Sequence, residues 1–161
     1  QLELSLLSDS QPRPMQNDTP RNGLQFWGHF LGFVRQPGGG DIDPTPAIRD
    51  VLPDCLGAGE EMPAFDFAER LAQALPVLDG GQWRYQVEAR MEPNALPAKS
   101  EGQLSTSLSR ALINLMLQEE LESQNPADVA RSDVFTGRDG VRPEYRYSWV
   151  RRPKATKRRA R

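Results

Sequence analysis

The sequence contains few residues of the kinds that build disulfide or metal sites. One cysteine, Cys55, and one histidine, His29, occur among its 161 residues. A single cysteine excludes an intrachain disulfide framework and a cysteine-rich metal site, and it is typical of a reducing compartment. The histidine has no second ligand nearby that would make a metal site. We therefore expect Cys55 to be packed in the core and His29 to occupy a core or edge position.

Long apolar runs and catalytic motifs are also missing. No stretch reaches the roughly 18 apolar residues that a membrane span needs, and no signal peptide is visible. The segment "PGGGD" has neither the spacing nor the lysine of a phosphate-binding loop, and no Ser-His-Asp set stands in a motif context. We predict a cytoplasmic protein that is not an enzyme, with no cofactor, no membrane association and no small-molecule substrate.

Charge is distributed unevenly behind a formal net charge of −2. The last eleven residues, "RRPKATKRRAR", hold seven basic side chains and no acid, so the remaining thirteen basic residues face twenty-two acids, a balance of −9. Phosphate attraction dominates nucleic-acid affinity, so the tail suits DNA binding far better than the body does. The alternative is a solvated end. The basic candidates for contact with the DNA backbone are Arg151, Arg152, Lys154, Lys157, Arg158 and Arg159.

Fourteen prolines and thirteen glycines divide the chain into short elements. Residues 1–22 are polar and are expected to form a flexible linker, residues 24–150 one domain, and residues 151–161 a disordered basic tail. Residues 24–35, "LQFWGHFLGFVR", predict a helix that is apolar almost all round and therefore buried, and that ends at "PGGGD". A second helix follows in "DIDPTPAIRDVLPDCLG", with Asp43 or Thr45 as its cap and Pro53 as a kink or stop.

Two further helices are indicated downstream, with an ambiguous segment between them. "PAFDFAERLAQALPVL" has helical spacing, with Phe67, Leu71 and Leu75 on one side. Residues 82–91 fit a strand by alternation and a helix by the spacing of Trp83 and Val87, and the sequence leaves both open. Residues 102–123, "GQLSTSLSRALINLMLQEELES", predict a helix capped by Ser105 or Ser107. Its core face comprises Leu104, Leu108, Ala111, Leu112, Leu115 and Met116.

The helix at 102–123 is followed by a hairpin signal. "GRDG" is a strong two-residue turn, and "YRYSWV" alternates as a strand does. A hydroxyl-opened helix followed by a two-stranded ribbon is the order of a winged helix-turn-helix domain. We therefore predict a mainly α, α+β fold that is winged helix-turn-helix-like, with several short helices and a C-terminal β-hairpin wing. The alternative is an ordinary capped helix beside a hairpin.

The outward face of this helix could meet either DNA or protein. Its polar members are Thr106, Ser107, Arg110 and Asn114, of which Arg110 and Asn114 suit guanine and adenine edges. The wing adds Arg138 and Arg142 as backbone contacts. However, Ile113 and Leu117 also point outward, and three acids at 119, 120 and 122 repel phosphate and oppose the helix dipole. A protein interface at Ile113 and Leu117 is therefore favoured over base reading.

Three stretches together resemble a bacterial protein family. They are "LQFWGHFLGFVR…DPTPAIRDVLP", "FAERLAQALPVLDGGQWRYQVEAR" and "LSTSLSRALINLML…SDVFTGRDG…YSWVRR". They are similar to the carboxyl-terminal part of the DpdG family, from the gene cluster that inserts 7-deazaguanine derivatives into DNA and restricts foreign DNA. The resemblance implies a cytoplasmic defence protein with winged-helix character that works with partner proteins on DNA. It implies no chemistry for any residue.

Three functional hypotheses follow. The leading one is a non-enzymatic winged-helix adaptor of an anti-phage system, which contacts other proteins of that system and the DNA backbone. A stand-alone transcription regulator would instead need a symmetric dimer with a defined half-site spacing. A structural subunit without a nucleic-acid role would use the basic tail only for solvation.

Overall fold

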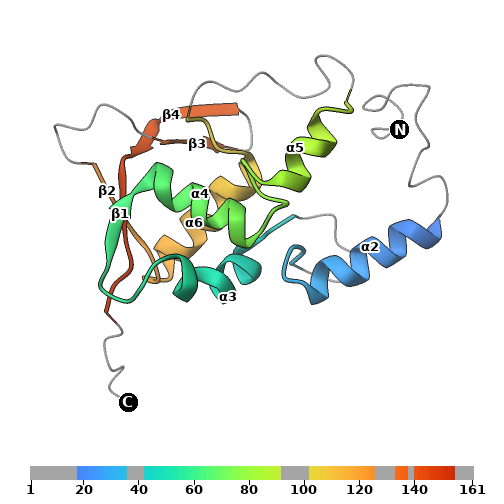
Figure 1. The fold of residues 1–161 in the computed structure, drawn as a ribbon, viewed down its shortest axis with the longest axis horizontal. Coiled ribbons are helices and arrows are strands. Elements are labelled where there is room, and N and C mark those ends of the chain that lie inside the picture. Colours follow the sequence, from blue (N-terminus) through green and yellow to red (C-terminus); the bar gives the residue numbers. More distant parts are fainter. Residues whose placement is uncertain (1–17, 36–41, 92–101, 126–132, 138–139, 155–161) are drawn as a thin grey trace.

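The structure is a computed structural model that describes residues 18–35, 42–91, 102–125, 133–137 and 140–154 (Figure 1). The described chain contains five helices and five strands. The helices are α2 Asp18–Phe30, α3 Thr45–Cys55, α4 Ala64–Ala74, α5 Gln82–Glu88 and α6 Thr106–Leu117. The strands are β1 Glu61–Pro63, β2 Glu122–Gln124, β3 Asp133–Gly137, β4 Gly140–Tyr147 and β5 Trp149–Arg151. The fold is α+β and mainly helical, as the sequence predicts.

The strands form two antiparallel sheets. A three-stranded sheet has the order β1-β5-β2, so the last strand lies in the middle. Val150 is opposite Met62 on one side and Ser123 on the other. β3 and β4 form a separate hairpin in which Gly137 pairs with Gly140. The predicted hairpin at "GRDG" is therefore confirmed, while residues 138 and 139 lie outside the described part of the chain.

The core lies between α3, α4, α6 and the three-stranded sheet. Ile48 from α3, Phe67 from α4 and Val150 from β5 are each fully buried. Four predicted core residues of α6 recur at helical spacing and are buried together, because one stripe of an amphipathic helix faces the interior. These are Leu108, Ala111, Leu112 and Leu115. Leu104, just before α6, joins the same cluster, and Met116 packs against its edge.

Asp43 binds a backbone amide at the start of α3, as the sequence predicts, although the N-cap residue is Pro44, which makes no side-chain capping hydrogen bond. Asp43 Oδ1 accepts a hydrogen bond of 3.1 Å from the backbone N–H of Thr45, and Pro46 occupies the first turn, where its missing N–H costs nothing. The prediction that Pro53 stops or kinks the helix is wrong about the stop, since α3 continues to Cys55. A proline so close to the end removes only a hydrogen bond of the last turn.

The predicted burial of residues 24–35 is wrong. The helix is α2, which begins at Asp18, inside the segment expected to be a linker, and ends at Phe30 before "PGGGD". Phe26, Trp27 and Phe30 are all exposed. The chain leaves the helix at Gly32, whose φ of 77° favours glycine. Phe33 just beyond packs on the core, so α2 is attached at its C-terminal end and extends away from the helical core (Figure 1).

The ambiguous segment at 82–91 is mostly helical. α5 spans Gln82–Glu88 and buries none of its residues. Arg84 forms an ion pair of 2.7 Å with Glu88 one turn later. The segment is a helix and not a strand because no described strand pairs with residues 82–88, while the charges at positions i and i+4 lie on one helix face.

No helix of the described residues is long and apolar enough to cross a membrane.

Two leucines of α6 test how the core is distributed. We expect Leu115→Ala to lower the free energy of unfolding by about 2–5 kcal/mol, because Leu115 is fully buried in the core. Leu117→Ala, two residues later, is the matched control. Leu117 is 78 % exposed, so its replacement should change stability by less than about 0.5 kcal/mol. Urea unfolding of both variants measures the contrast, and equal destabilisation would contradict the packing of α6.

Candidate functional site

Nearby side chains form hydrogen bonds at the N-terminus of α6. The Ser105 hydroxyl accepts a hydrogen bond of 3.3 Å from the backbone N–H of Leu108, so the predicted cap is confirmed. Ser107 lies with its hydroxyl 3.2 Å from that of Ser105. The backbone N–H of Ser105 donates to the carboxylate of Asp79, which also pairs with Arg84 at 2.7 Å. A carboxylate beside the helix start repels a phosphate that would approach it.

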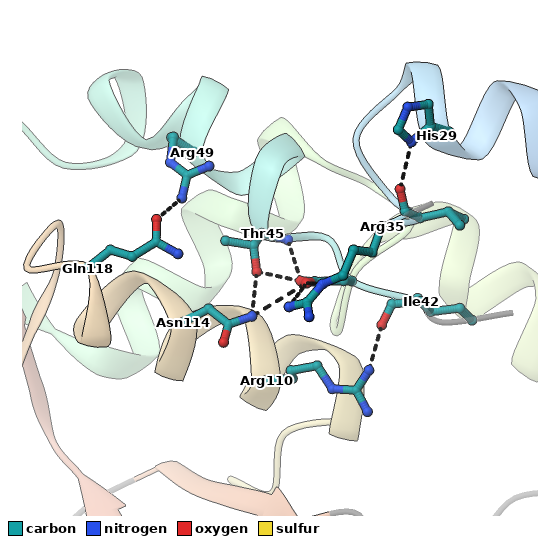
Figure 2. Close-up of polar contacts among 10 residues, drawn as sticks. His29, Arg35, Ile42, Thr45, Arg49, Arg110, Asn114 and Gln118 are labelled. Atoms are coloured by element: carbon teal, nitrogen blue, oxygen red, sulfur yellow. Dashed lines mark hydrogen bonds and ion pairs between the residues drawn. The ribbon is translucent and has the colours of Figure 1, made fainter. Parts of the chain in front are cut away.

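Arg110 and Asn114 of α6, and Gln118 just after it, form a polar row that makes hydrogen bonds to α3 and the segment before it (Figure 2). Asn114 Nδ2 donates to Thr45 Oγ1 at 3.2 Å and to Asp43 Oδ2 at 3.4 Å. Arg110 lies one turn earlier, with Nη1 3.4 Å from the carbonyl oxygen of Ile42. One turn later, Gln118 Oε1 accepts a hydrogen bond from the guanidinium of Arg49 on α3. Three positions four residues apart therefore hold α6 against α3 and the segment before it.

Asp43 is the centre of this row. It is 4 % exposed, and its Oδ2 accepts hydrogen bonds of 2.8 and 3.1 Å from the guanidinium of Arg35. The Thr45 hydroxyl donates to Oδ1. Burial raises the pKa of Asp43, but the hydrogen bonds from Thr45 and Arg35 lower it by more, so its pKa lies below the usual 3.8. The carboxylate stays ionised because three side chains, Asn114 included, donate to it.

This network changes the interpretation of the predicted base readers. The angular position of Asn114 on the helix suggests an outward side chain, whereas the structure places its amide among buried polar groups. To reach an adenine, Asn114 would have to give up its hydrogen bonds to Asp43 and Thr45, which costs free energy. Thr106 and Arg110 are half-buried. Reasoning from the sequence missed Asp43 as a partner of α6, although its position beside the start of α3 already made it a cap candidate.

The solvent-facing side of α6 is aliphatic. Ile113 and Leu117, four residues apart, are both exposed large apolar side chains. They therefore share one face of the helix. β3 lies against α6 as well. The side of α6 that remains open to a partner thus carries a small apolar ridge instead of a polar base-reading face.

Two of the three acids after α6 form ion pairs within the fold. Glu120 pairs with Arg49 at 2.9 Å, and Glu122 on β2 pairs with Arg151 on β5 at 2.6 Å. Glu119 stands at the helix end with a φ of 59°. The pairing removes much of the repulsion that the acids would exert on a phosphate. It also engages Arg151, one of the cations that the sequence predicted to contact DNA.

The C-terminal basic residues divide into three groups. Arg151 belongs to β5, inside the segment expected to be a tail, and Arg152 Nη1 donates to the carbonyl oxygen of Leu56 at 3.2 Å. Lys154 lies along Gly59, where an added Cβ would be 2.7 Å from Lys154 Cε. Arg142 is in β4, but its side chain lies outside the described set, as do Arg138, Lys157, Arg158 and Arg159. Arg146, exposed on β4, is a further candidate that the sequence pattern did not single out.

The remaining sequence candidates are structural. Cys55 is buried as predicted. Burial raises the pKa of its thiol, the charge of Asp54 raises the pKa further, and the charge of Arg70 lowers it by a smaller amount. A raised pKa keeps the thiol protonated and unreactive. His29 is exposed near the end of α2, with Nδ1 3.2 Å from the carbonyl oxygen of Val34. Among the described residues, no three His, Cys, Asp or Glu side chains gather as a metal site would require.

Comparison with known proteins identifies one family. A family model described as DpdG-like matches residues 1–129. The match includes all five described helices and strands β1 and β2, and it ends before β3, so the "SDVFTGRDG…YSWVRR" part of the sequence resemblance lies outside it. No curated protein and no solved structure matches the chain.

The charge network predicts how stability depends on pH. The folded pKa of Asp43 is lowered, so its stabilising contribution is present above the unfolded pKa of about 3.9 and disappears as pH falls through the folded value. Asp43→Asn should lower the free energy of unfolding by about 1.5–3 kcal/mol at pH 6, and the difference from wild type should shrink below about pH 4. Urea unfolding at pH 6 and pH 3 measures it. Asp50→Asn, on the exposed side of α3, is the control and should leave both values nearly unchanged. A pH-independent difference would contradict an ionised Asp43.

Proposed function

The chain belongs to the DpdG-like family, and on that basis we propose that it is a non-enzymatic winged-helix adaptor in a bacterial DNA-modification and restriction system. In this role α6 binds another protein of the system, and the C-terminal basic residues hold the DNA backbone. The family membership supports the assignment to such a system, and the geometry of α6 supports a role for this helix in binding protein and not DNA. The observation that carries the proposal is that the polar row of α6 is bound to α3 while Ile113 and Leu117 remain exposed.

The winged-helix part of the proposal is supported by element order. After α3 come β1, α4, α5, α6, β2, the β3–β4 hairpin and β5, and the sheet order β1-β5-β2 places the last strand between the first two. In a winged helix-turn-helix domain, α4 and α6 would form the helical pair and the β3–β4 hairpin the wing. α5, inserted between α4 and α6, departs from a tight turn between two such helices.

A protein partner at α6 is supported by side-chain type. The cores of protein interfaces are depleted of charged residues, and a few well-packed side chains near the centre supply most of the affinity. Ile113 and Leu117 are spaced like the anchors of a helix that lies in an apolar groove. A wet major groove would instead be met by polar side chains at these positions.

Substitutions on α6 test the protein interface. Ile113→Asp with Leu117→Asp should abolish co-purification of the tagged chain with proteins encoded in the same cluster, because two buried carboxylates would remain unpaired in the complex. Val87→Asp on α5 is the matched control, since Val87 is also an exposed aliphatic helix residue. Retention of the same partners by the double variant would refute the assignment of α6.

DNA-backbone contact is assigned to residues beyond the strand pairings. Arg151 and Arg152 already have partners within the fold. Lys157, Arg158, Arg159 and Arg161 are concentrated in the last five residues of the sequence. Phosphates neutralised by such cations release counterions, and the affinity then falls steeply with salt.

A truncation after Lys154 measures this contribution. We expect the slope of log affinity against log salt, for any random-sequence duplex, to become shallower by about 0.9 for each phosphate that the shortened chain no longer neutralises. Arg151→Gln should change the slope much less, because Arg151 is paired with Glu122. Fluorescence anisotropy from about 50 to 200 mM salt gives both slopes. Equal slopes for the truncated and full chains would contradict a tail that binds DNA.

One observation favours a second candidate function, a structural subunit without a nucleic-acid role. The described C-terminal cations Arg151 and Arg152 serve the fold itself. In that case the duplex would show no mobility shift with the full chain even at low salt, whereas the partner would still be captured through Ile113 and Leu117. The salt titration and the co-purification together distinguish the two functions.

A further inference from the structure

Helix α2 carries an exposed aromatic ridge, formed by Phe26, Trp27, Phe30 and Leu31. The three rings are 65 %, 57 % and 72 % exposed. They already contact one another edge to face, with ring centroids 5.8 and 5.7 Å apart along the ridge. Large exposed apolar patches on soluble domains mark binding surfaces, because removing apolar surface from water lowers the free energy.

The α2 ridge is held in place at one end. Phe33 packs on the core, Val34 forms a bridge with Ile42, and the backbone N–H of Asp43 donates to the carbonyl oxygen of Phe33 at 3.0 Å. Gly28 allows Val34 to approach the helix, since an added Cβ there would lie 2.8 Å from Val34 Cγ2. The ridge therefore projects from an anchored helix end beside the helical core (Figure 1).

The α2 ridge carries no charge that would repel a copy of the same surface. No Asp, Glu, Lys or Arg occurs between Arg21 and Arg35. A two-fold interface brings the same patch from both subunits together, so a charged patch would face like charge. A neutral apolar patch meets its own copy without that repulsion. It also has no charge with which to select an anionic or cationic partner.

The area is sufficient for a small dimer interface. An aromatic side chain covers roughly 150–250 Å², so three rings exposed by 57–72 % present about 400 Å² per copy. Two copies with Leu31 and the flanking backbone reach about 1,000 Å², near the lower limit for a specific interface. Additional edge-to-face ring pairs would form across the axis.

We propose that the α2 ridge is a two-fold symmetric dimer interface, in which α2 of one copy packs against α2 of a second copy. This inference goes beyond the proposed function, because it does not depend on α6, on DNA or on the system in which the chain works. It explains why α2, which the sequence pattern predicted to be buried in the core, instead exposes its aromatic side chains.

Sedimentation equilibrium of the full chain tests the proposal. The weight-average mass should rise with concentration and level off at twice the mass of one chain. Trp27→Ser with Phe30→Ser should weaken self-association at least tenfold, and Phe26→Ser alone should weaken it in the same direction. Trp83→Ser is the matched control: Trp83 on α5 is 56 % exposed, against 57 % for Trp27, and its replacement should leave the dimer intact. Circular dichroism melts establish that each variant is folded.

Three results would overturn the proposal. The first is a single-chain mass at every concentration up to several hundred micromolar. The second is a dimer that Trp27→Ser with Phe30→Ser leaves as tight as wild type, or that Trp83→Ser weakens equally. The third is a mass that keeps rising beyond two chains, as head-to-tail docking of α2 into the groove of about 1030 Å³ between α4 and α5 would produce.

Discussion

The ionised carboxylate of Asp43 is the contact on which the arrangement of the helices depends. It joins Arg35 after α2, Thr45 at the start of α3 and Asn114 on α6. A buried charge is tolerated only when donors surround it, so its position fixes how these three segments meet. The same contact gives Asn114 of α6 a partner within the fold. What α6 offers to other molecules is consequently the aliphatic side at Ile113 and Leu117.

Local features of the sequence predicted local features of the structure well. The helical spacing of leucines after a serine was enough to give the position, the cap and the core face of α6, because cap and stripe both depend on residues within one or two turns. The hairpin at "GRDG" followed from turn chemistry in the same way. β1, by contrast, was not predicted. Three residues, Glu61–Pro63, carry no period of their own and become a strand only by pairing with β5.

The failures concern which face of a helix is covered. α2 is apolar around most of its circumference, which ordinarily indicates burial, yet a sequence does not say what is available to cover it. On α6 the reverse happened: Asn114 was placed outward by its helical angle, and Asp43, 71 residues earlier in the chain, covers it. The candidate site was therefore half predictable. Ile113 and Leu117 are exposed as expected. The hydrogen bonds of Asn114 and the ion pair of Arg151 could not be predicted, because their partners lie far away in the sequence.

The central place of β5 has a consequence for biosynthesis. β1 ends at Pro63, but the strand that pairs with it begins only at Trp149. Ribosomes extend the chain vectorially, at about 5–20 residues per second, so β1 and the helices emerge several seconds before their sheet can close. Pairings so distant in sequence form late and slowly. During that interval the apolar face that Val150 will cover stays open, and the nascent chain depends on the helices alone to protect it.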